Sequence, residues 1–373
     1  MMKKIKILAV CGTRPDTIKT APLVKELLSH SEVELILAVT GQHREMLEQV
    51  LRAFELTPDY DLKIMTAGQS LSAITTKVLL GLEKIIDERK PDLVIAQGDT
   101  TTTFAASLAA FYAKIPFGHV EAGLRTDNKY DPFPEEINRR LTGIISELHF
   151  APTEKAKANL LREHVPEKDI TVTGNTGIDA LLSIAGKPMT FDDPKIDEAF
   201  SHPRTVLMTA HRRENWGGPM LDICRAAREI VSRNQDVSIL FSMHKNPVVR
   251  DVVKAELEGV ERIYLIEPPD YLPFVHIMKK SYLILSDSGG VQEEAPSLGV
   301  PVLVMRKTTE RPEGVEAGVA KLVGTDPDNV MRYVQLLLDD RAEYDKMSRV
   351  ENPYGDGRAS ERIWAAIKEK FEE

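Results

Sequence analysis

Short apolar runs alternate with amphipathic segments along the whole chain, and this alternation constrains the fold more than any other feature. The run KILAV lies at 6–10 and VELILAV at 33–39, and the segment between them has helical period. Strands buried on both faces of a parallel sheet are apolar throughout, and the helices between them form right-handed crossovers. The alternation therefore predicts an α/β fold with parallel sheets. The other predicted strands are 92–97, 115–120, 147–151, 169–174, 204–210, 237–243, 262–266, 282–287 and 301–305.

Two domains are expected, because 373 residues exceed what one hydrophobic core usually holds. The alternation breaks at 186–203, a polar segment with prolines and no clear period. We predict two Rossmann-like, doubly wound domains at 1–175 and 176–355, with a cleft between them. A last amphipathic helix, within 356–373, is expected to pack back on the first domain.

Charge and cysteine content exclude several classes of protein. The net charge of −9 disfavours nucleic-acid binding, although a local basic pocket for an anionic small molecule is compatible with it. Cys11 and Cys224 are far apart in sequence, which fits a reducing cytoplasm. The short apolar run at the N-terminus reads as a first strand and not as a signal peptide, and no segment is long enough to span a membrane. No metal-binding spacing such as HExxH and no GxGxxG motif is present, so neither a metal nor a nicotinamide is expected.

Ligands of open parallel sheets bind beyond the carboxyl ends of the strands, so the residues after each strand are the first candidates. The run at 6–10 is followed by a turn in which Thr13 can cap a helix, with Arg14 and Lys19 near its start. Two cations at a helix N-terminus suit a phosphate or diphosphate, and solvated surface side chains are the alternative. Asp99 follows the strand at 92–97, where it could instead cap the next helix.

The stretch HVEAGLR ends a predicted strand on a carboxylate, Glu121, whose structural alternative is a buried salt bridge to Arg125. Glu135 and Arg139 are four residues apart on one helix face, which is also the spacing of a surface ion pair. We expect Asp99, Glu121 and Glu135 to converge. Gathered carboxylates raise the pKa of at least one of them, which supplies an acid and a base near neutral pH.

The second half of the chain has a matching set of polar strand ends. Histidines and an arginine follow the strands at 204–210 and 237–243. The glycines after 282–287 can present backbone N–H groups to an anion, and the acid one helical turn later can accept from ribose hydroxyls. These candidates are His211, Arg212, His244, Ser288, Gly289, Gly290 and Glu294.

Nine motifs follow one another along nearly the whole chain: GTRPDTIKTAP, GDTTTT, HVEAGLRT, FPEEINRRLTG, GNTGIDAL, HRREN, SDSGGVQEEAPSLG, TTERPE and NPYGDG. Together they resemble the non-hydrolysing UDP-N-acetylglucosamine 2-epimerases. The resemblance implies two Rossmann-like domains in the arrangement of GT-B glycosyltransferases, usually a homodimer, with no cofactor. It also implies a cytoplasmic enzyme that binds UDP-N-acetylglucosamine (UDP-GlcNAc) and UDP and whose product feeds cell-envelope polysaccharide.

The implied reaction inverts C2 of the sugar: a base takes the C2 proton while UDP leaves C1, giving 2-acetamidoglucal. UDP then adds back, and the proton returns to the opposite face. By resemblance the catalytic residues are Asp99, Glu121, Glu135 and His211, and which carboxylate performs which step stays open. The implied substrate contacts are Arg14, Lys19, Arg139, Arg212, His244, Phe274, Ser288, Gly289, Gly290 and Glu294.

The chain departs from the family pattern at two positions. Asp16 stands where the family commonly has Glu. The resemblance implies an allosteric substrate site that includes Gln42, His43 and Gln69, but Gly68 stands where the activated pattern has Arg.

Four alternatives share parts of this pattern. They are an epimerase of a related UDP-diacetamido sugar, a hydrolysing relative, a glycosyltransferase of the same fold, and a non-catalytic nucleotide-sugar sensor. The three acids argue against the last two.

Overall fold

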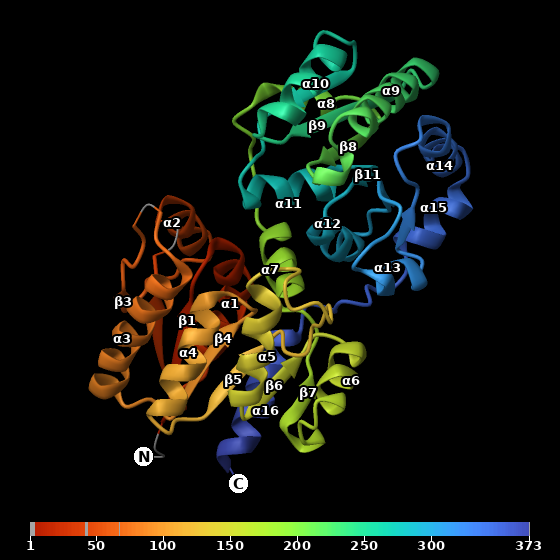
Figure 1. Cartoon of the computed structure of the whole chain (residues 1–373). Helices are drawn as coiled ribbons and strands as arrows, with labels where there is room; N and C mark the ends of the chain where they lie inside the picture. The colour runs from red at the N-terminus through yellow and green to blue at the C-terminus, as the bar shows by residue number, and fades with distance from the viewer. Residues whose placement is uncertain (1–3, 42–43, 67, 373) are drawn as a thin grey trace. The chain divides into compact units, whose positions relative to one another are not determined.

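The computed structural model describes residues 4–41, 44–66 and 68–372, which form two compact units. The first unit runs to Ala180 and takes up the chain again from Gly355, and the second comprises Leu181–Tyr354 (Figure 1). Among the described residues, no helix has the length and hydropathy needed to cross a membrane.

The first unit is built on a sheet in which the described residues form seven parallel strands, in the order β3-β2-β1-β4-β5-β6-β7. Strand β1 pairs with both β2 and β4, and β4 pairs with β5, so the carboxyl ends of β1, β4 and β5 are adjacent. The strands are β1 (Ile5–Cys11), β2 (Val33–Val39), β3 (Tyr60–Asp61), β4 (Leu93–Gln97), β5 (Phe117–Val120), β6 (Leu148–Ala151) and β7 (Ile170–Val172).

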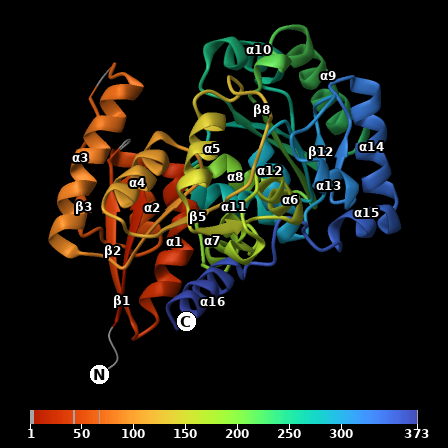
Figure 2. The same cartoon turned by 60° about the horizontal axis from the view of Figure 1, so that its bottom comes forward.

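Helices cover this sheet, and several begin with the capping residues that their sequences supply. Thr13 and Asp16 form a reciprocal capping box at the start of α1, while Ser70 and Thr100 cap α3 and α4. The C-terminal helix α16 lies beside α1 (Figure 2). The helices are α1 (Arg14–Leu28), α2 (Arg44–Ala53), α3 (Leu71–Arg89), α4 (Thr101–Tyr112), α5 (Glu135–Ile145), α6 (Glu154–Arg162), the 3₁₀ turn η1 (Glu167–Asp169), α7 (Thr176–Ala185), which extends into the second unit, and α16 (Ala359–Glu372).

The second unit repeats the parallel architecture, and its described residues form six strands in the order β10-β9-β8-β11-β12-β13. Its core is a cluster of buried apolar residues around β8, β9 and α9. The strands are β8 (Arg204–Ala210), β9 (Val237–Met243), β10 (Ile263–Ile266), β11 (Leu283–Ser286), β12 (Val302–Val304) and β13 (Ala320–Leu322). The helices are α8 (Pro194–Phe200), η2 (Arg213–Asn215), α9 (Gly218–Arg233), α10 (Pro247–Leu257), α11 (Tyr271–Lys280), α12 (Gly289–Glu294), η3 (Ala295–Leu298), α13 (Pro312–Glu316), α14 (Pro327–Asp339) and α15 (Arg341–Ser348).

The prediction of two parallel-sheet α/β domains is confirmed, and every apolar run predicted as a strand overlaps one. Two strands were not predicted, β3 and β13, and each forms an edge of its sheet. β3 is only two residues long, and β13 contains the exposed Lys321. A strand of two residues, or of three with a charged residue in the middle, contains no apolar run long enough to indicate it in the sequence.

Candidate active site

Glu121 lies directly after β5 in the left-handed backbone region, with φ of +66°. Its Oε1 accepts from Lys19 Nζ at 2.5 Å, and its Oε2 accepts from Gln97 at the end of β4. The predicted alternative, a salt bridge to Arg125, is wrong, because Arg125 pairs with Glu163, directly after α6, at 2.6 Å. Glu121 is therefore tied to the start of α1 and to β4, at the edge where the strands end.

Asp99 follows β4 and contacts α5. Arg139 donates to its Oδ2 through Nε at 3.1 Å and also through Nη2, and Oδ1 has no partner among the described residues. The expectation that Asp99 caps the next helix is wrong, because the side chain of Thr100 accepts from Thr103 N and fills that position. The carboxylate of Asp99 is thus free of capping and keeps one unused oxygen.

Two further side chains fix the backbone around Asp99. Asn138 on α5 donates to the Asp99 carbonyl at 3.0 Å. His119 on β5 contacts the Gly98 carbonyl through Nε2 at 2.7 Å. Burial lowers the pKa of His119 to about 3, so its ring is neutral and donates this bond. The β4–α4 turn is therefore anchored on both sides.

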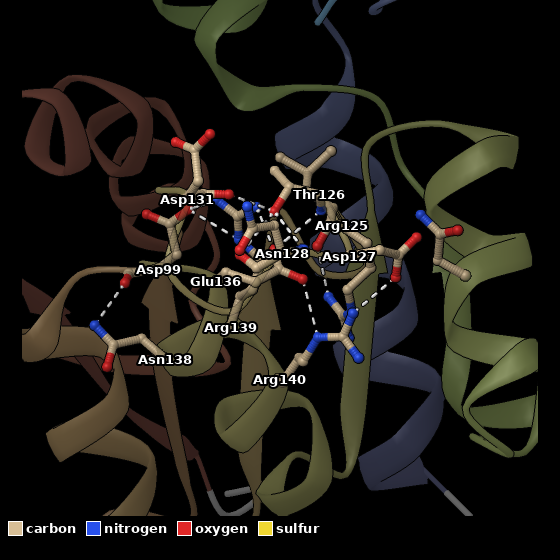
Figure 3. A network of polar contacts seen from close by, with 12 residues as sticks. Asp99, Arg125, Thr126, Asp127, Asn128, Asp131, Glu136, Asn138, Arg139 and Arg140 are labelled. Carbon is tan, nitrogen blue, oxygen red and sulfur yellow. Dashed lines mark hydrogen bonds and ion pairs between the residues drawn. The ribbon is translucent and has the colours of Figure 1, made fainter. Parts of the chain in front are cut away.

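Glu136 holds Arg139 in place beside Asp99 (Figure 3). Its fully buried carboxylate accepts from Arg139 Nη1 at 3.1 Å, from Arg140 Nε at 2.9 Å and from the backbone N–H of Thr126 at 3.0 Å. Burial acts to raise the pKa of Glu136, but the bonds from Arg140 and Thr126 and the charge of Arg139 outweigh it and lower that pKa. The expected pairing of Arg139 with Glu135 is wrong, since its partners are Glu136 and Asp99.

Glu135, the first residue of α5, is half-buried and has no hydrogen bond or ion pair to the residues that the structure describes. It starts the helix that carries Arg139 and Asn138, both of which reach Asp99. The helix itself thus links Glu135 to the strand edge.

The raised pKa expected at this edge belongs to a residue outside the predicted set, Asp16. Burial, opposed by bonds from Thr13 and Thr100 and reinforced by the charge of Asp99, raises its pKa from 3.8 to about 6. A Cβ built on Gly98 would lie 3.8 Å from Asp16 Oδ1 and 3.7 Å from Glu121 Oε2, so both carboxylates flank this glycine. Asp16, Asp99 and Glu121 therefore gather around the end of β4.

Of the remaining candidates of the first unit, Arg14 is the first residue of α1 and Gln69 lies just before α3. Arg14 is half-buried and has no partner among the described residues. Gln42 and His43 lie outside the described residues. Gln69 is half-buried and bonds to Thr66 and Lys77, so in this structure it serves the loop before α3.

In the second unit, His211 follows β8 and is joined to Asp287, which follows β11. The distance from His211 Nδ1 to Asp287 Oδ1 is 2.9 Å. The ring of His244, after β9, stacks on that of His211 with 5.8 Å between centroids. Burial and the neighbouring charge of His211 lower the pKa of His244. Two histidines and a buried aspartate thus meet at three neighbouring strand ends.

Ser288 precedes α12, whose first two residues are Gly289 and Gly290. A Cβ on Gly289 would lie 3.7 Å from Arg212 Nη2 and 3.9 Å from the guanidinium carbon of Arg311, so two cations approach the start of this helix. Helix N-termini and guanidinium groups both bind anions.

A second contact joins α12 to α11. Tyr271 donates to Glu294 Oε1 at 3.1 Å, and the half-buried Phe274 lies three residues later on α11. Residues three apart share a helix face, which brings Phe274 to the side of α11 that meets Glu294.

Sequence reasoning missed several contributors. His119 and Glu136 lie inside the motifs HVEAGLRT and FPEEINRRLTG, Asp287 inside SDSGG, and Arg311 inside TTERPE. These motifs were the available signal, but a linear motif does not show which of its side chains is buried. Among the described residues, no group of histidine, cysteine and acidic side chains has an arrangement that could hold a metal ion.

Comparisons with known proteins give one consistent result. A family model described as UDP-N-acetylglucosamine 2-epimerase matches residues 25–368. The UDP-N-acetylglucosamine 2-epimerases of Bacillus subtilis (strain 168) and Escherichia coli (strain K12) are 53% and 52% identical, and the matches cover 97% and 98% of this chain and 94% and 98% of theirs. A crystal structure of the Neisseria meningitidis UDP-GlcNAc 2-epimerase bound to UDP-GlcNAc is 50% identical, with a TM-score of 0.85 over 98% of this chain and 100% of that one.

Proposed function

Since this chain belongs to the UDP-N-acetylglucosamine 2-epimerase family, we propose that it interconverts UDP-GlcNAc and UDP-N-acetylmannosamine. The observation that carries the proposal is the group of acids around the carboxyl end of β4, with Lys19 and Arg139 among them. A fold of this kind that only held a nucleotide would have no use for carboxylates gathered at this edge. Structures of relatives are described as bound to UDP-GlcNAc, or to UDP-GlcNAc and UDP.

The proposed reaction is an elimination followed by an addition. A carboxylate takes the C2 proton, the electrons of that bond form the C1=C2 double bond, and the C1–O bond breaks so that UDP leaves with its electron pair. In the return step, UDP oxygen adds to C1 while a proton is delivered to the other face of C2. No electron acceptor is needed, because the sugar is neither oxidised nor reduced overall.

The two faces of C2 require two proton carriers, and we assign them to Asp99 and Glu135. Support comes from their unused oxygens: Oδ1 of Asp99 and the carboxylate of Glu135 have no partner among the described residues. Both oxygens of Glu121, by contrast, accept bonds, from Lys19 and Gln97. Glu121 therefore serves to orient Lys19 and to bind the sugar, and not as the C2 base.

The departing diphosphate needs positive charge, because UDP gains negative charge as the C1–O bond breaks. We assign this role to Arg14, Lys19 and Arg212, with His211 donating to the phosphate oxygen. Ser288, Gly289 and Gly290 bind the diphosphate through backbone N–H groups. Glu294 binds the ribose, and Phe274 contacts the uracil. His244 is the remaining residue that we assign to the UDP-binding site. The first unit thus carries the sugar chemistry and the second the nucleotide.

We further propose a homodimer that works in the cytoplasm. Support for self-association comes from large exposed apolar side chains on the neighbouring helices α3, α4 and α5, among them Leu80, Phe111, Tyr112 and Ile144. The two cysteines are buried and free, as in a reducing compartment. Sedimentation velocity tests the dimer, and a monomer at micromolar concentration would contradict it.

Product analysis tests the proposed function. Incubation with UDP-GlcNAc, followed by proton NMR, is expected to give a stable mixture of UDP-GlcNAc and UDP-N-acetylmannosamine. Free N-acetylmannosamine and UDP would instead identify a hydrolase, and an unchanged substrate would contradict the proposal. Turnover of a UDP-diacetamido sugar with no turnover of UDP-GlcNAc would identify a C2 epimerase with a different substrate.

A further inference from the structure

The buried carboxylate of Asp287 lies behind His211 in the second unit, and no role for it follows from the reaction alone. We propose that Asp287 is a positioning residue that keeps the proton of His211 on Nδ1 and so presents Nε2 to the substrate phosphate. The inference rests on the proposed function for the identity of that phosphate. Its structural part concerns the second unit only and stands on contacts there.

The carboxylate of Asp287 is fixed from several sides before the imidazole is considered. It is fully buried and accepts from the backbone N–H groups of His211 and Arg212, both at 2.9 Å from Oδ2. Asn215 donates to the same oxygen at 2.9 Å and to the Met305 carbonyl at 3.2 Å. A carboxylate held by three donors cannot follow a moving ring, so the ring must adapt to the carboxylate.

The remaining oxygen, Oδ1, faces the imidazole of His211, 2.9 Å from Nδ1. An ionised carboxylate is an acceptor only, so Nδ1 must carry the proton. Burial acts to raise the pKa of Asp287, but the bond and charge of His211 and the backbone donors outweigh it, and the pKa is lowered. The carboxylate therefore stays charged and keeps accepting from Nδ1–H of His211.

His244 restricts the ring from the other side. Its plane is inclined by 26° to that of His211 at 5.8 Å between centroids. Its Nδ1 accepts from the backbone N–H of Asn246 at 3.1 Å, which requires a neutral ring with the proton on Nε2. The neutral stacked ring limits rotation of His211 without adding a competing positive charge.

Only Nε2 of His211 is left for the substrate. Nε2 has no partner among the described residues, and 39% of the side chain is exposed. In the imidazolium form Nε2–H donates to the phosphate oxygen as UDP leaves. In the neutral form the lone pair on Nε2 can take back that proton when UDP returns. Asp287 stays ionised in both steps, so the proton moves only between Nε2 and the phosphate oxygen.

The competing explanation is that Asp287 only secures the loop after β8. Asp287→Asn separates the two explanations. The asparagine oxygen can still accept the backbone N–H groups, but its NH₂ group donates toward Nδ1. A donor at that position makes Nδ1 an acceptor and moves the ring proton to Nε2, which is the wrong tautomer for accepting a proton there.

The test uses the full chain with ¹⁵N-labelled histidine and long-range ¹H–¹⁵N NMR without substrate, with His211→Asn to assign the signals. We expect the proton on Nδ1 of His211 in the wild type and on Nε2 in Asp287→Asn. We expect kcat with UDP-GlcNAc to fall about 10²-fold in Asp287→Asn, with KM nearly unchanged, because a mispositioned acid–base group affects the chemical step.

Asp236→Asn is the matched control, since Asp236 pairs with Arg204 at the opposite end of β8. Asp236→Asn makes the same chemical change in the same unit and should leave the tautomer of His211 and kcat unchanged. An unaltered tautomer in Asp287→Asn, or an equal loss of kcat in the control, would overturn the inference. The NMR result decides the role of Asp287 even if the wild type does not turn over UDP-GlcNAc, which would refute the proposed function alone.

Discussion

Glu121 combines an unfavourable backbone conformation with a complete set of partners. A residue other than glycine at φ of +66° costs about 1–2 kcal/mol, and the surroundings must hold it there. Lys19 and Gln97 do so from α1 and β4. The conformation turns the carboxylate away from Arg125, the neighbour that local sequence suggests, and toward a lysine 102 residues away.

Glu121→Gln is expected to remove epimerisation and to retain UDP binding. The amide cannot offset the charge of Lys19, so the lysine loses the fixed position from which it offsets charge on the departing diphosphate. Arg14, Arg212 and the second unit still bind UDP. We expect kcat to fall about 10²-fold or more. Coupled enzyme assays and calorimetry with UDP measure the two effects. A variant that fails to fold would instead assign Glu121 a structural role, and a variant with wild-type kcat would contradict the proposed contact.

Asp16 predicts a pH dependence of stability. Its pKa is about 6 in the folded chain against an ordinary value of 3.8, so the folded state binds the proton more tightly. The corresponding stabilisation is complete below the ordinary pKa and is lost as the pH rises through about 6, by up to about 3 kcal/mol. Asp16→Asn cannot ionise and avoids this loss.

The free energy of unfolding of Asp16→Asn relative to the wild type should therefore increase between about pH 4 and pH 7. Urea denaturation at a series of pH values measures it. A difference that is constant over this range would mean that Asp16 is not the buried acid that titrates.

At the scale of elements, α5 performs two separate tasks with adjacent residues. Glu136 faces inward and binds Arg139, Arg140 and the loop at Thr126 (Figure 3). Glu135, by contrast, has no partner among the described residues. Sequence alone paired Arg139 with Glu135, because four-residue spacing is the usual rule for helix ion pairs. The loop before α5 sets the rotation of the helix, and no local rule predicts that rotation.

Substitutions of the neighbouring residues Glu135 and Glu136 should affect different properties, kcat for Glu135 and stability for Glu136. Glu136→Gln removes one of the two carboxylates that pair with buried Arg139 and leaves only Asp99. We expect a loss of about 3 kcal/mol of unfolding free energy. Glu135→Gln should leave stability unchanged and lower kcat about 10²-fold. Urea denaturation measures the unfolding free energy of both variants, and steady-state kinetics measure their kcat. Loss of stability in Glu135→Gln alone would contradict the assignment.

Gly123 allows the loop after β5 to pass close to α6. A Cβ there would lie 2.8 Å from the carbonyl carbon of Ala156, and φ is +91°. Gly123→Ala should therefore cost about 3 kcal/mol or more, from overpacking and backbone strain.

Gly259→Ala is the control for Gly123→Ala, because its φ is +78° but nothing lies within 4 Å of the added Cβ. It should cost only about 1 kcal/mol. Equal losses in urea denaturation would show that close packing against α6 is not what Gly123 provides.

At the scale of the whole molecule, the sequence predicts architecture better than contacts. Continuous apolar runs identify inner strands, since both faces of such strands are buried, and the order of strands and helices then implies the parallel sheets. The strand ends also contain most of the candidate site, because ligands of parallel sheets bind there. Pairings such as Lys19 with Glu121 and His211 with Asp287 depend on strand register and side-chain direction, and one sequence contains neither.

The proposed reaction requires that C2 loses and regains a proton through different groups on its two faces. Epimerisation of UDP-GlcNAc in heavy water, followed by NMR, tests it most directly. We predict deuterium at C2 of UDP-N-acetylmannosamine from the first turnover, because the group that delivers the proton exchanges with solvent, and loss of this incorporation in Asp99→Asn and Glu135→Gln. Product that retains its C2 hydrogen would contradict the account.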